Sequence, residues 1–150
     1  MKISRIILST LLSGFACAAF AQDISGLWSQ IDDKTGSSKA VLEIKKNNDG
    51  TFSGTIVEVT PRPGYVPKKN CQNCPAPFTN KPILGLEVLQ GLKQDEKNHN
   101  QFENGKILDP LNGKIYSSRA RLSSNGKRLS LRGYIGVSAL GRSQTWIRKE

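Results

Sequence analysis

Apolar and polar residues alternate along most of this chain. The alternation is clearest in three runs: Ala40, Leu42 and Ile44; Leu84, Leu86 and Val88; and Leu129, Leu131, Gly133 and Ile135. Alternation places every second side chain on one face of a strand, whereas the period of an amphipathic helix is nearly absent. The pattern therefore predicts an all-β protein whose strands each have one buried face.

Turn signals separate these runs, at Asn48-Asp49-Gly50, Asn104-Gly105, Asn112-Gly113 and Asn125-Gly126. We predict eight strands, at residues 25–31, 39–46, 51–59, 83–91, 101–108, 114–123, 128–136 and 141–148. Their succession favours one small antiparallel up-and-down β-barrel, because closure removes exposed sheet edges; a β-sandwich is the alternative. Asn104-Gly105 is either a bulge in the fifth strand or an extra hairpin. The interior of such a barrel is either hollow or filled by side chains.

The first residues have the pattern of a secretory signal peptide. Lys2 and Arg5 precede a mainly apolar run at 6–15, and Ala19-Phe20-Ala21 is an A-x-A cleavage site. The apolar run is shorter than the roughly 20 residues that a membrane-spanning helix needs. We therefore expect cleavage of residues 1–21, export to the periplasm or the exterior, and one domain at 22–150 without a transmembrane segment.

The chain is strongly basic, with a formal net charge of +10 that becomes +8 when Lys2 and Arg5 are removed. For an exported protein the accessible anions are lipid phosphates, cell-wall polymers and acidic ligands, so nucleic acid is not an expected partner. A solvated basic surface explains the same charge without any partner.

If the chain reverses at each turn, its connections divide between the two ends of the barrel. One end receives polar hairpins at 47–50, 92–100 and 124–127. The other end receives the connections at 32–38, 61–82, 109–113 and 137–140, which hold the notable acidic, cysteine and apolar residues. We expect this second end to be the functional mouth.

Cys71 and Cys74 are the only cysteines of the expected mature chain. In an oxidising compartment a disulfide between them is expected. A redox-active pair is the alternative, although no helix is predicted that would lower a thiol pKa. A zinc site needs two more ligands, and the single histidine, His99, lies at the other end of the barrel. We expect no metal and no cofactor.

Asp32, Asp33 and Asp109 gather at the expected mouth. They are candidate ligand-binding residues, and Asp33 with Asp109 supplies the carboxylates that a hydrolase uses. Turn chemistry also explains them, because Asp precedes a Lys-Thr-Gly turn and Asp109-Pro110 opens a β-turn. With one histidine in a polar loop, a histidine-based catalyst is not expected.

Two groups combine aromatic and cationic residues. Trp28 and Arg148 lie on the first and last expected strands, which are neighbours in a closed barrel, so a guanidinium stacked on the indole would stabilise closure. The second group is Arg142 and Trp146, which share one parity with Gln144, together with Arg132, Tyr134 and Tyr116 on neighbouring strands. The second group either binds an anionic or aromatic ligand or forms the polar outer side of a hairpin.

The turn at residues 136–141 is apolar, unlike the other predicted turns. Val137, Ala139 and Leu140 need a partner to cover them. The turn either folds inward as a plug, which we favour, or stays exposed as a hydrophobic lip that meets a ligand.

Several motifs resemble a family of small secreted bacterial proteins known as a domain of unknown function, number 2147. They are Gly26-Leu27-Trp28, Asp32-Asp33-Lys34-Thr35-Gly36, Cys71-x-x-Cys74-Pro75, Ile107 to Tyr116 around Asp109-Pro110, and Arg132 to Val137 with Gly141 to Arg148. The resemblance covers nearly all of the mature chain and implies no established activity. More distantly, Gly26-x-Trp28 and the terminal Arg148 resemble the lipocalin group, in which the Trp lies at the barrel base under the Arg.

Three function classes remain. We favour a carrier or sensor that binds a small amphipathic or anionic ligand at the barrel mouth, because no catalytic set emerges. The second is an envelope protein that uses its basic charge to bind an anionic lipid, polymer or protein. An enzyme is the least favoured class, and the sequence does not indicate an oligomeric state.

Overall fold

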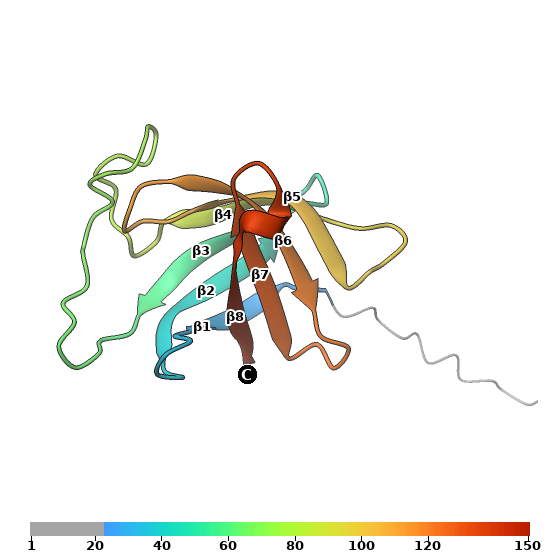
Figure 1. Ribbon diagram of the computed structural model, residues 1–150, viewed down its shortest axis with the longest axis horizontal. Helices are drawn as coiled ribbons and strands as arrows, with labels where there is room; N and C mark the ends of the chain where they lie inside the picture. The colour runs from blue at the N-terminus through green and yellow to red at the C-terminus, as the bar shows by residue number, and fades with distance from the viewer. Residues whose placement is uncertain (1–22) are drawn as a thin grey trace, which may run out of the picture.

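The computed structural model describes residues 23–150 and contains a closed antiparallel barrel of eight strands (Figure 1). The strands are β1 Gly26–Ile31, β2 Ser38–Lys46, β3 Phe52–Val59, β4 Glu87–Gln94, β5 Gln101–Leu108, β6 Ile115–Leu122, β7 Arg128–Tyr134 and β8 Arg142–Lys149. One 3₁₀ turn, η1 at Ser138–Leu140, separates β7 from β8. The predicted signal peptide, residues 1–21, with its cleavage site lies outside the described residues.

Each strand pairs with the next one along the chain, and β1 pairs with β8 to close the barrel. The register of this last pair places Trp28 opposite Arg148 and Gln30 opposite Trp146. The up-and-down barrel predicted from alternation is thus confirmed, and the sandwich is not adopted. Closure leaves none of the eight strands with an unpaired edge.

Seven strands lie within about two residues of their predicted positions, but the fourth does not. It spans Glu87–Gln94 rather than 83–91, and the side chain of Leu84 is 60% exposed instead of facing the core. Residues 83–86 form the end of the preceding connection, in which Gly85 has a positive φ. Ile135 was also wrongly placed on a buried face, because β7 ends at Tyr134 and Ile135 is exposed.

The Asn104-Gly105 step is a bulge within β5, not a hairpin. Asn104 has a φ of 60°, and the pairing of β5 with β6 shifts register between Phe102 and Gly105. A side chain at Gly105 would collide with Leu92 and Ser118, so the close approach of β4 and β6 requires glycine here.

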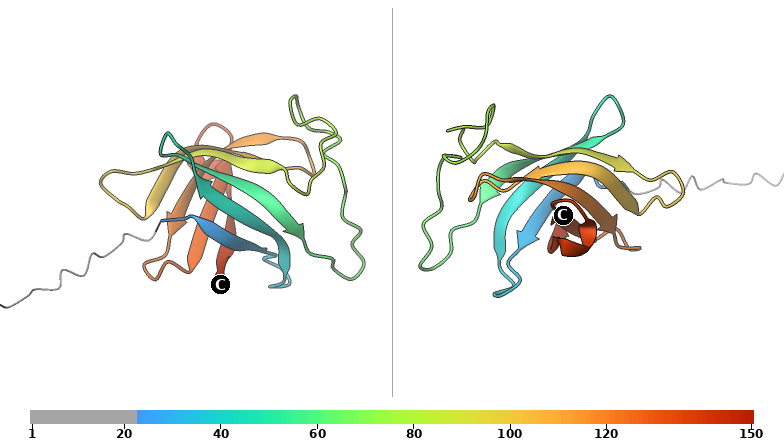
Figure 2. Two further views of the ribbon diagram at one scale, coloured as in Figure 1. Left: turned by 180° about the vertical axis from the view of Figure 1, so that it is seen from behind. Right: turned by 45° about the horizontal axis from the view of Figure 1, so that its top comes forward.

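The barrel interior is divided into a packed half and an open half. Large side chains fill the end where β1 begins, and Phe52 and Phe102 meet there edge to face with ring centroids 5.5 Å apart. This packed half comprises Trp28, Ile44, Phe52, Leu89, Leu92, Phe102, Ala120, Leu122 and Leu129. The opposite end carries the connections 32–37, 60–86, 109–114 and 135–141, of which 60–86 projects furthest (Figure 2).

Candidate ligand cavity at the barrel mouth

A cavity of about 520 Å³ occupies the open half of the barrel. Six strands each contribute two or more residues at their mouth ends. The other two contribute one residue each, Val88 from β4 and Tyr116 from β6. Its walls are mainly apolar; they include Ile31, Ala40, Leu42, Ile56, Val59, Ile83, Val88, Ile107, Leu108 and Leu131. The volume lies in the range of about 300–1,000 Å³ that is typical of small-molecule sites.

Trp146 separates the cavity from the packed half. Its side chain is only 1% exposed, it belongs to the core cluster, and it also lines the cavity. The register of β7 and β8 places it opposite Leu129, the first large residue of the packed half on β7. An aromatic ring therefore forms the floor on which a ligand would rest.

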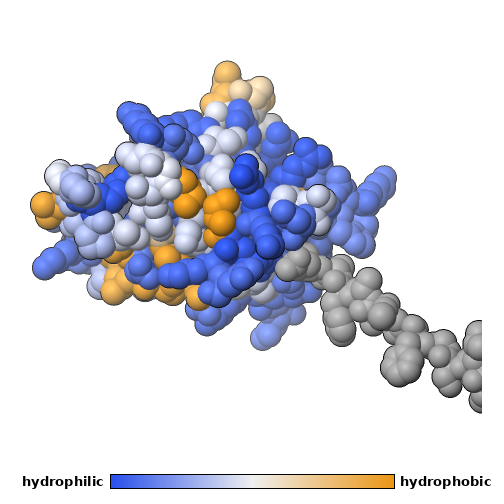
Figure 3. Space-filling model, turned by 90° about the horizontal axis from the view of Figure 1, so that it is seen from below, coloured by the Kyte–Doolittle hydropathy of each residue, from blue (hydrophilic) through white to orange (hydrophobic). Residues whose placement is uncertain are grey.

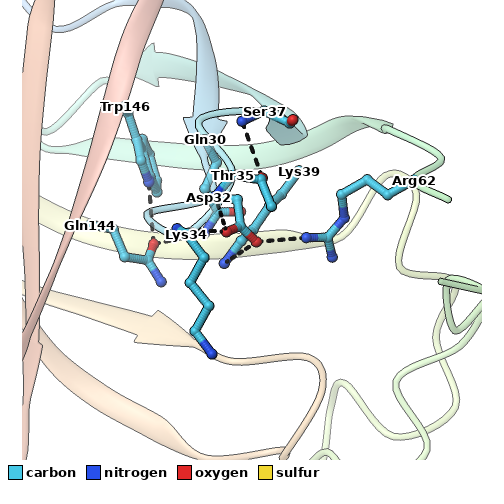
Figure 4. Close-up of polar contacts among 9 residues, drawn as sticks. All are labelled: Gln30, Asp32, Lys34, Thr35, Ser37, Lys39, Arg62, Gln144 and Trp146. Carbon is cyan, nitrogen blue, oxygen red and sulfur yellow. Dashed lines mark hydrogen bonds and ion pairs between the residues drawn. The ribbon is translucent and has the colours of Figure 1, made fainter. Parts of the chain in front are cut away.

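A hydrogen-bond network links three inward-facing residues of β1 and β8 (Figure 4). The indole nitrogen of Trp146 donates to Oε1 of Gln144 at 3.3 Å, and Nε2 of Gln30 donates to the same oxygen at 2.7 Å. Both glutamines are half-buried and line the cavity. The network places polar groups on a wall that is mainly apolar.

The Asp32 carboxylate organises one side of the mouth (Figure 4). Its Oδ1 accepts backbone hydrogen bonds from Lys34 and Thr35, as in an Asx turn. Its Oδ2 lies 2.7 Å from Nη1 of Arg62 and 3.6 Å from Nζ of Lys39. The Lys34 backbone bond is the main cause that holds the pKa of Asp32 below its ordinary value of 3.8. The Thr35 bond and the two cations add to the shift, while burial opposes it.

Arg62 is held in place at the mouth. Its guanidinium carbon lies 4.5 Å from the centroid of the Tyr65 ring, a cation–π contact, in addition to the bond to Asp32. Arg62, Tyr65 and Lys39 all line the cavity. Asp32 thus acts behind the rim, where its single negative charge pairs with two cations and offsets half of their charge.

Two further cations at the rim, Lys68 and Arg142, form no ion pair with any residue in the range 23–150. Two acids also line the cavity, of which Asp33 is exposed. The other, Asp109, accepts a bond from the Leu111 backbone at 2.9 Å, which closes its own turn. The structural use of Asp109 as a turn residue matches the turn chemistry of its sequence.

The segment around the cysteines packs against the mouth. Cys71 and Cys74 form the expected disulfide and are both buried in the core cluster. A side chain at Gly113, which has a φ of 74°, would overlap the carbonyl of Asn73. The β5–β6 turn and the disulfide segment therefore touch backbone to backbone. The turn lines the cavity, and the disulfide segment supports it from behind.

The apolar turn between β7 and β8 is a lip and not a plug. The side chains of Val137 and Leu140 are 61% and 81% exposed, while Leu140 also lines the cavity. The preference for a plug was wrong, because the three apolar residues of the turn are exposed and none of them joins the core cluster. The face shown in Figure 3 is mostly hydrophilic, with several smaller apolar patches.

Most of the residues singled out in the sequence come together here. Those that line the cavity are Asp33, Asp109, Tyr116, Tyr134, Arg142 and Trp146. Asp32 lies behind the rim, and Arg132 does not reach the cavity: it is on the outer face, where it donates to Oγ of Ser143 and to the carbonyl of Ala139. Gln30, Lys39, Arg62 and Lys68 were missed. Gln30 was detectable, since it shares the parity of Trp28 two residues earlier.

The described residues also bear on metal binding and on membrane crossing. No three His, Cys, Asp or Glu side chains in 23–150 are grouped so that they would hold a metal ion. Within the same residues, no helix has the length and apolarity needed to cross a membrane.

Residues 26–148 match a family described as an uncharacterized protein conserved in bacteria (DUF2147). The chain belongs to this family. A solved structure from the human pathogen Helicobacter pylori, described as belonging to the lipocalin family, is similar with a TM-score of 0.69 and 24% sequence identity. The similarity covers 85% of this chain and 84% of that chain, and it shows that this DUF2147 member has a lipocalin-like fold. The comparison with curated proteins gave no match.

Proposed function

We propose that this protein is an exported carrier or sensor that binds one small amphipathic molecule in the cavity at the barrel mouth. The observation that carries the proposal is the cavity itself, about 520 Å³ of space with apolar walls and a partly cationic rim. The apolar walls would remove the ligand's hydrocarbon part from water, which is the main source of binding free energy for such a molecule.

The rim charges favour an anionic head group. Lys39 and Arg62 share the Asp32 carboxylate, whereas Lys68 and Arg142 have no carboxylate partner among residues 23–150. A ligand whose carboxylate or sulfonate lies at the mouth would be attracted by these two cations without being dehydrated. Export is supported by the N-terminal pattern and agrees with a disulfide, which persists in oxidising compartments.

Probe displacement on the exported protein tests the proposal. An anilinonaphthalene sulfonate combines an apolar ring system with an anion, so it should fluoresce on binding, and native mass spectrometry of gently purified protein should show a co-purified mass. Ile56→Trp places a large ring in the cavity, while the neighbouring Val57→Trp adds the same ring outside. We expect a loss of at least about tenfold in probe affinity for Ile56→Trp only. Equal binding by both folded variants would exclude the cavity as the site.

A second candidate function has its own observation. A groove on the outer face of β5 to β8 contains three arginines, Arg119, Arg121 and Arg132, beside Glu103. Such a surface suits an anionic envelope component, whose binding would weaken as salt rises. Vesicles that contain an anionic lipid test it: Arg121→Gln should reduce binding and Arg142→Gln at the mouth should not. Unchanged vesicle binding by Arg121→Gln would count against this surface.

A further inference from the structure

The indole of Trp146 fixes the orientation of the Gln144 amide. An indole nitrogen has a hydrogen to donate and no lone pair to accept with. The atom of Gln144 that faces it at 3.3 Å must therefore be the oxygen, Oε1. With the amide turned over, two N–H donors would face each other on the cavity floor.

The same logic sets the second amide. Because Gln144 presents its oxygen, the atom of Gln30 that lies 2.7 Å away must be the donor Nε2. The orientations of both amides thus follow from one residue that cannot accept a hydrogen bond. The register supports the arrangement, since Gln30 is paired with Trp146 across the seam of β1 and β8.

This network leaves one donor and one acceptor without a protein partner. Within residues 23–150, nothing bonds to Nε2 of Gln144 or to Oε1 of Gln30. Neither atom is sealed inside the protein, and both residues line the cavity. Figure 4 shows the Gln144 nitrogen directed away from Trp146. The cavity wall therefore offers an N–H donor and a carbonyl acceptor on neighbouring strands.

We propose that Gln30 and Gln144 bind an uncharged group of the ligand that both donates and accepts a hydrogen bond, such as a hydroxyl or an amide. The inference rests on the cavity binding proposed above and names a second recognition point inside it. A hydroxyl can accept from Nε2 of Gln144 and donate to Oε1 of Gln30, whereas a carboxylate can only accept. A pure hydrocarbon would displace water from both amides without replacing the hydrogen bonds that the water made.

Trp146 also makes this donor and acceptor pair rigid. The floor residue cannot move without opening the packed half, because it is almost fully buried in the core cluster. Its hydrogen bond to Gln144 holds that amide in place, and the bond from Gln30 to Gln144 holds the second amide. Polar groups held in this way discriminate between ligands with and without a matching group, because they cannot turn to satisfy each other.

A homologous series of fatty acids and their ω-hydroxy counterparts tests the inference, with affinity measured by displacement of the anilinonaphthalene sulfonate. The carboxylate of each probe tests the rim, and the hydroxyl tests the amides. At the chain length where the hydroxyl reaches the amides, we expect the hydroxy acid to bind about tenfold more tightly than the unsubstituted acid.

Three variants locate the effect. Gln30→Met removes the acceptor and leaves the bond between Gln144 and Trp146 in place. Gln144→Glu keeps the oxygen that Trp146 needs and removes the donor. Each should reduce the preference for the hydroxy acid to within about twofold, while Gln90→Met, on the exposed face of β4, should leave it unchanged. Circular dichroism identifies any variant that fails to fold. If one of the two cavity variants does not fold, the result for the other one tests the inference.

The outcomes separate the two proposals. Binding of both acids without a hydroxyl preference at any chain length would overturn the role of the amides and leave the cavity site standing. A preference that survives in both folded glutamine variants would also overturn it. Binding of the sulfonate probe that neither acid displaces would overturn this inference alone. Failure of the sulfonate probe and of both acids to bind would overturn the carrier proposal and this inference together.

Discussion

The guanidinium carbon of Arg148 lies 4.4 Å from the centroid of the Trp28 ring, across the seam between the first and last strands. The same guanidinium donates to the main-chain carbonyls of Gly126, Ser25 and Asp23. Trp28 in turn donates its indole hydrogen to the carbonyl of Ile24 at 2.9 Å. The contact predicted from barrel closure is confirmed, and it ties the β6–β7 turn and the residues before β1 to the last strand.

Replacing Arg148 should destabilise the barrel. Arg148→Lys keeps the charge but cannot reach three carbonyls and the ring at once, so we expect a loss of about 2–3 kcal/mol in the free energy of unfolding. Urea denaturation measures it, and a double-mutant cycle with Trp28→Leu should give a coupling of about 0.5–2 kcal/mol. Lys149→Gln, next along the strand and exposed, is the control and should change stability by less than about 0.5 kcal/mol. A coupling energy of zero would show that the contact between the ring and the guanidinium does not stabilise the barrel.

Asp32 should make stability depend on pH in the acid range. Its pKa in the folded state is lowered, mainly by the Lys34 backbone hydrogen bond, so the charged form is favoured by folding. The resulting stability is fully present well above 3.8, the ordinary value, and is lost as the pH falls through the folded pKa. Melting temperatures of the wild type and Asp32→Asn should therefore converge as the pH is lowered past 3.8. A constant gap at every pH would contradict this assignment.

The disulfide predicts how the two thiols react. Cys71 and Cys74 should resist alkylation in denaturant without reductant and should both be alkylated once reductant is added. Reduction should lower the free energy of unfolding by at most ~2 kcal/mol, because the closed loop is short. Mass spectrometry and urea unfolding provide the two readouts, with Cys74→Ala as a variant whose stability should not respond to reductant. Alkylation of both cysteines before reduction would show that the exported protein lacks the bond.

Leu140 should matter for binding and not for folding. Because its side chain is 81% exposed, Leu140→Asp should change stability by less than about 0.5 kcal/mol. It should weaken binding of the anilinonaphthalene sulfonate, because it replaces apolar rim surface with a negative charge. Leu84→Asp changes an exposed leucine that does not line the cavity and should alter neither property. A marked drop in the melting temperature of Leu140→Asp alone would mean that the turn folds inward in solution.

The barrel could be predicted because its evidence is local. Alternation in β2 and β7 sets the buried face, and glycine turns set the reversals, so strand order and closure follow. The fourth strand was misplaced because the alternation already begins at Leu84 and Leu86, which belong to the turn before β4. Only pairing with β3 and β5 decides where such a strand starts.

The cavity could not be predicted, because its existence depends on sizes of side chains that meet only in the fold. The residues that face inward at the mouth are Ala40, Gly133 and the two glutamines. At the base, by contrast, the larger side chains of Trp28, Phe52 and Phe102 fill the corresponding space. Parity indicates that a residue faces inward, but not whether its neighbours across the barrel leave room beside it. Arg132 shows that side-chain chemistry can mislead. Its parity correctly placed it away from the apolar face, and only its charge suggested a place in the binding site.

The division of the interior into a packed half and an open half gives the two ends of the barrel different tasks. The base holds the barrel closed, and the mouth has room for the ligand proposed above. Residues such as Phe52 and Leu129 belong to the core cluster without lining the cavity, whereas Ile56 and Val88 belong to the same cluster and also line the cavity. Under the proposed carrier function, single replacements around the mouth would alter which molecule is accepted while the base continues to hold the barrel closed. Under the same proposal, a lineage built on this plan would be free to diversify its ligands one side chain at a time.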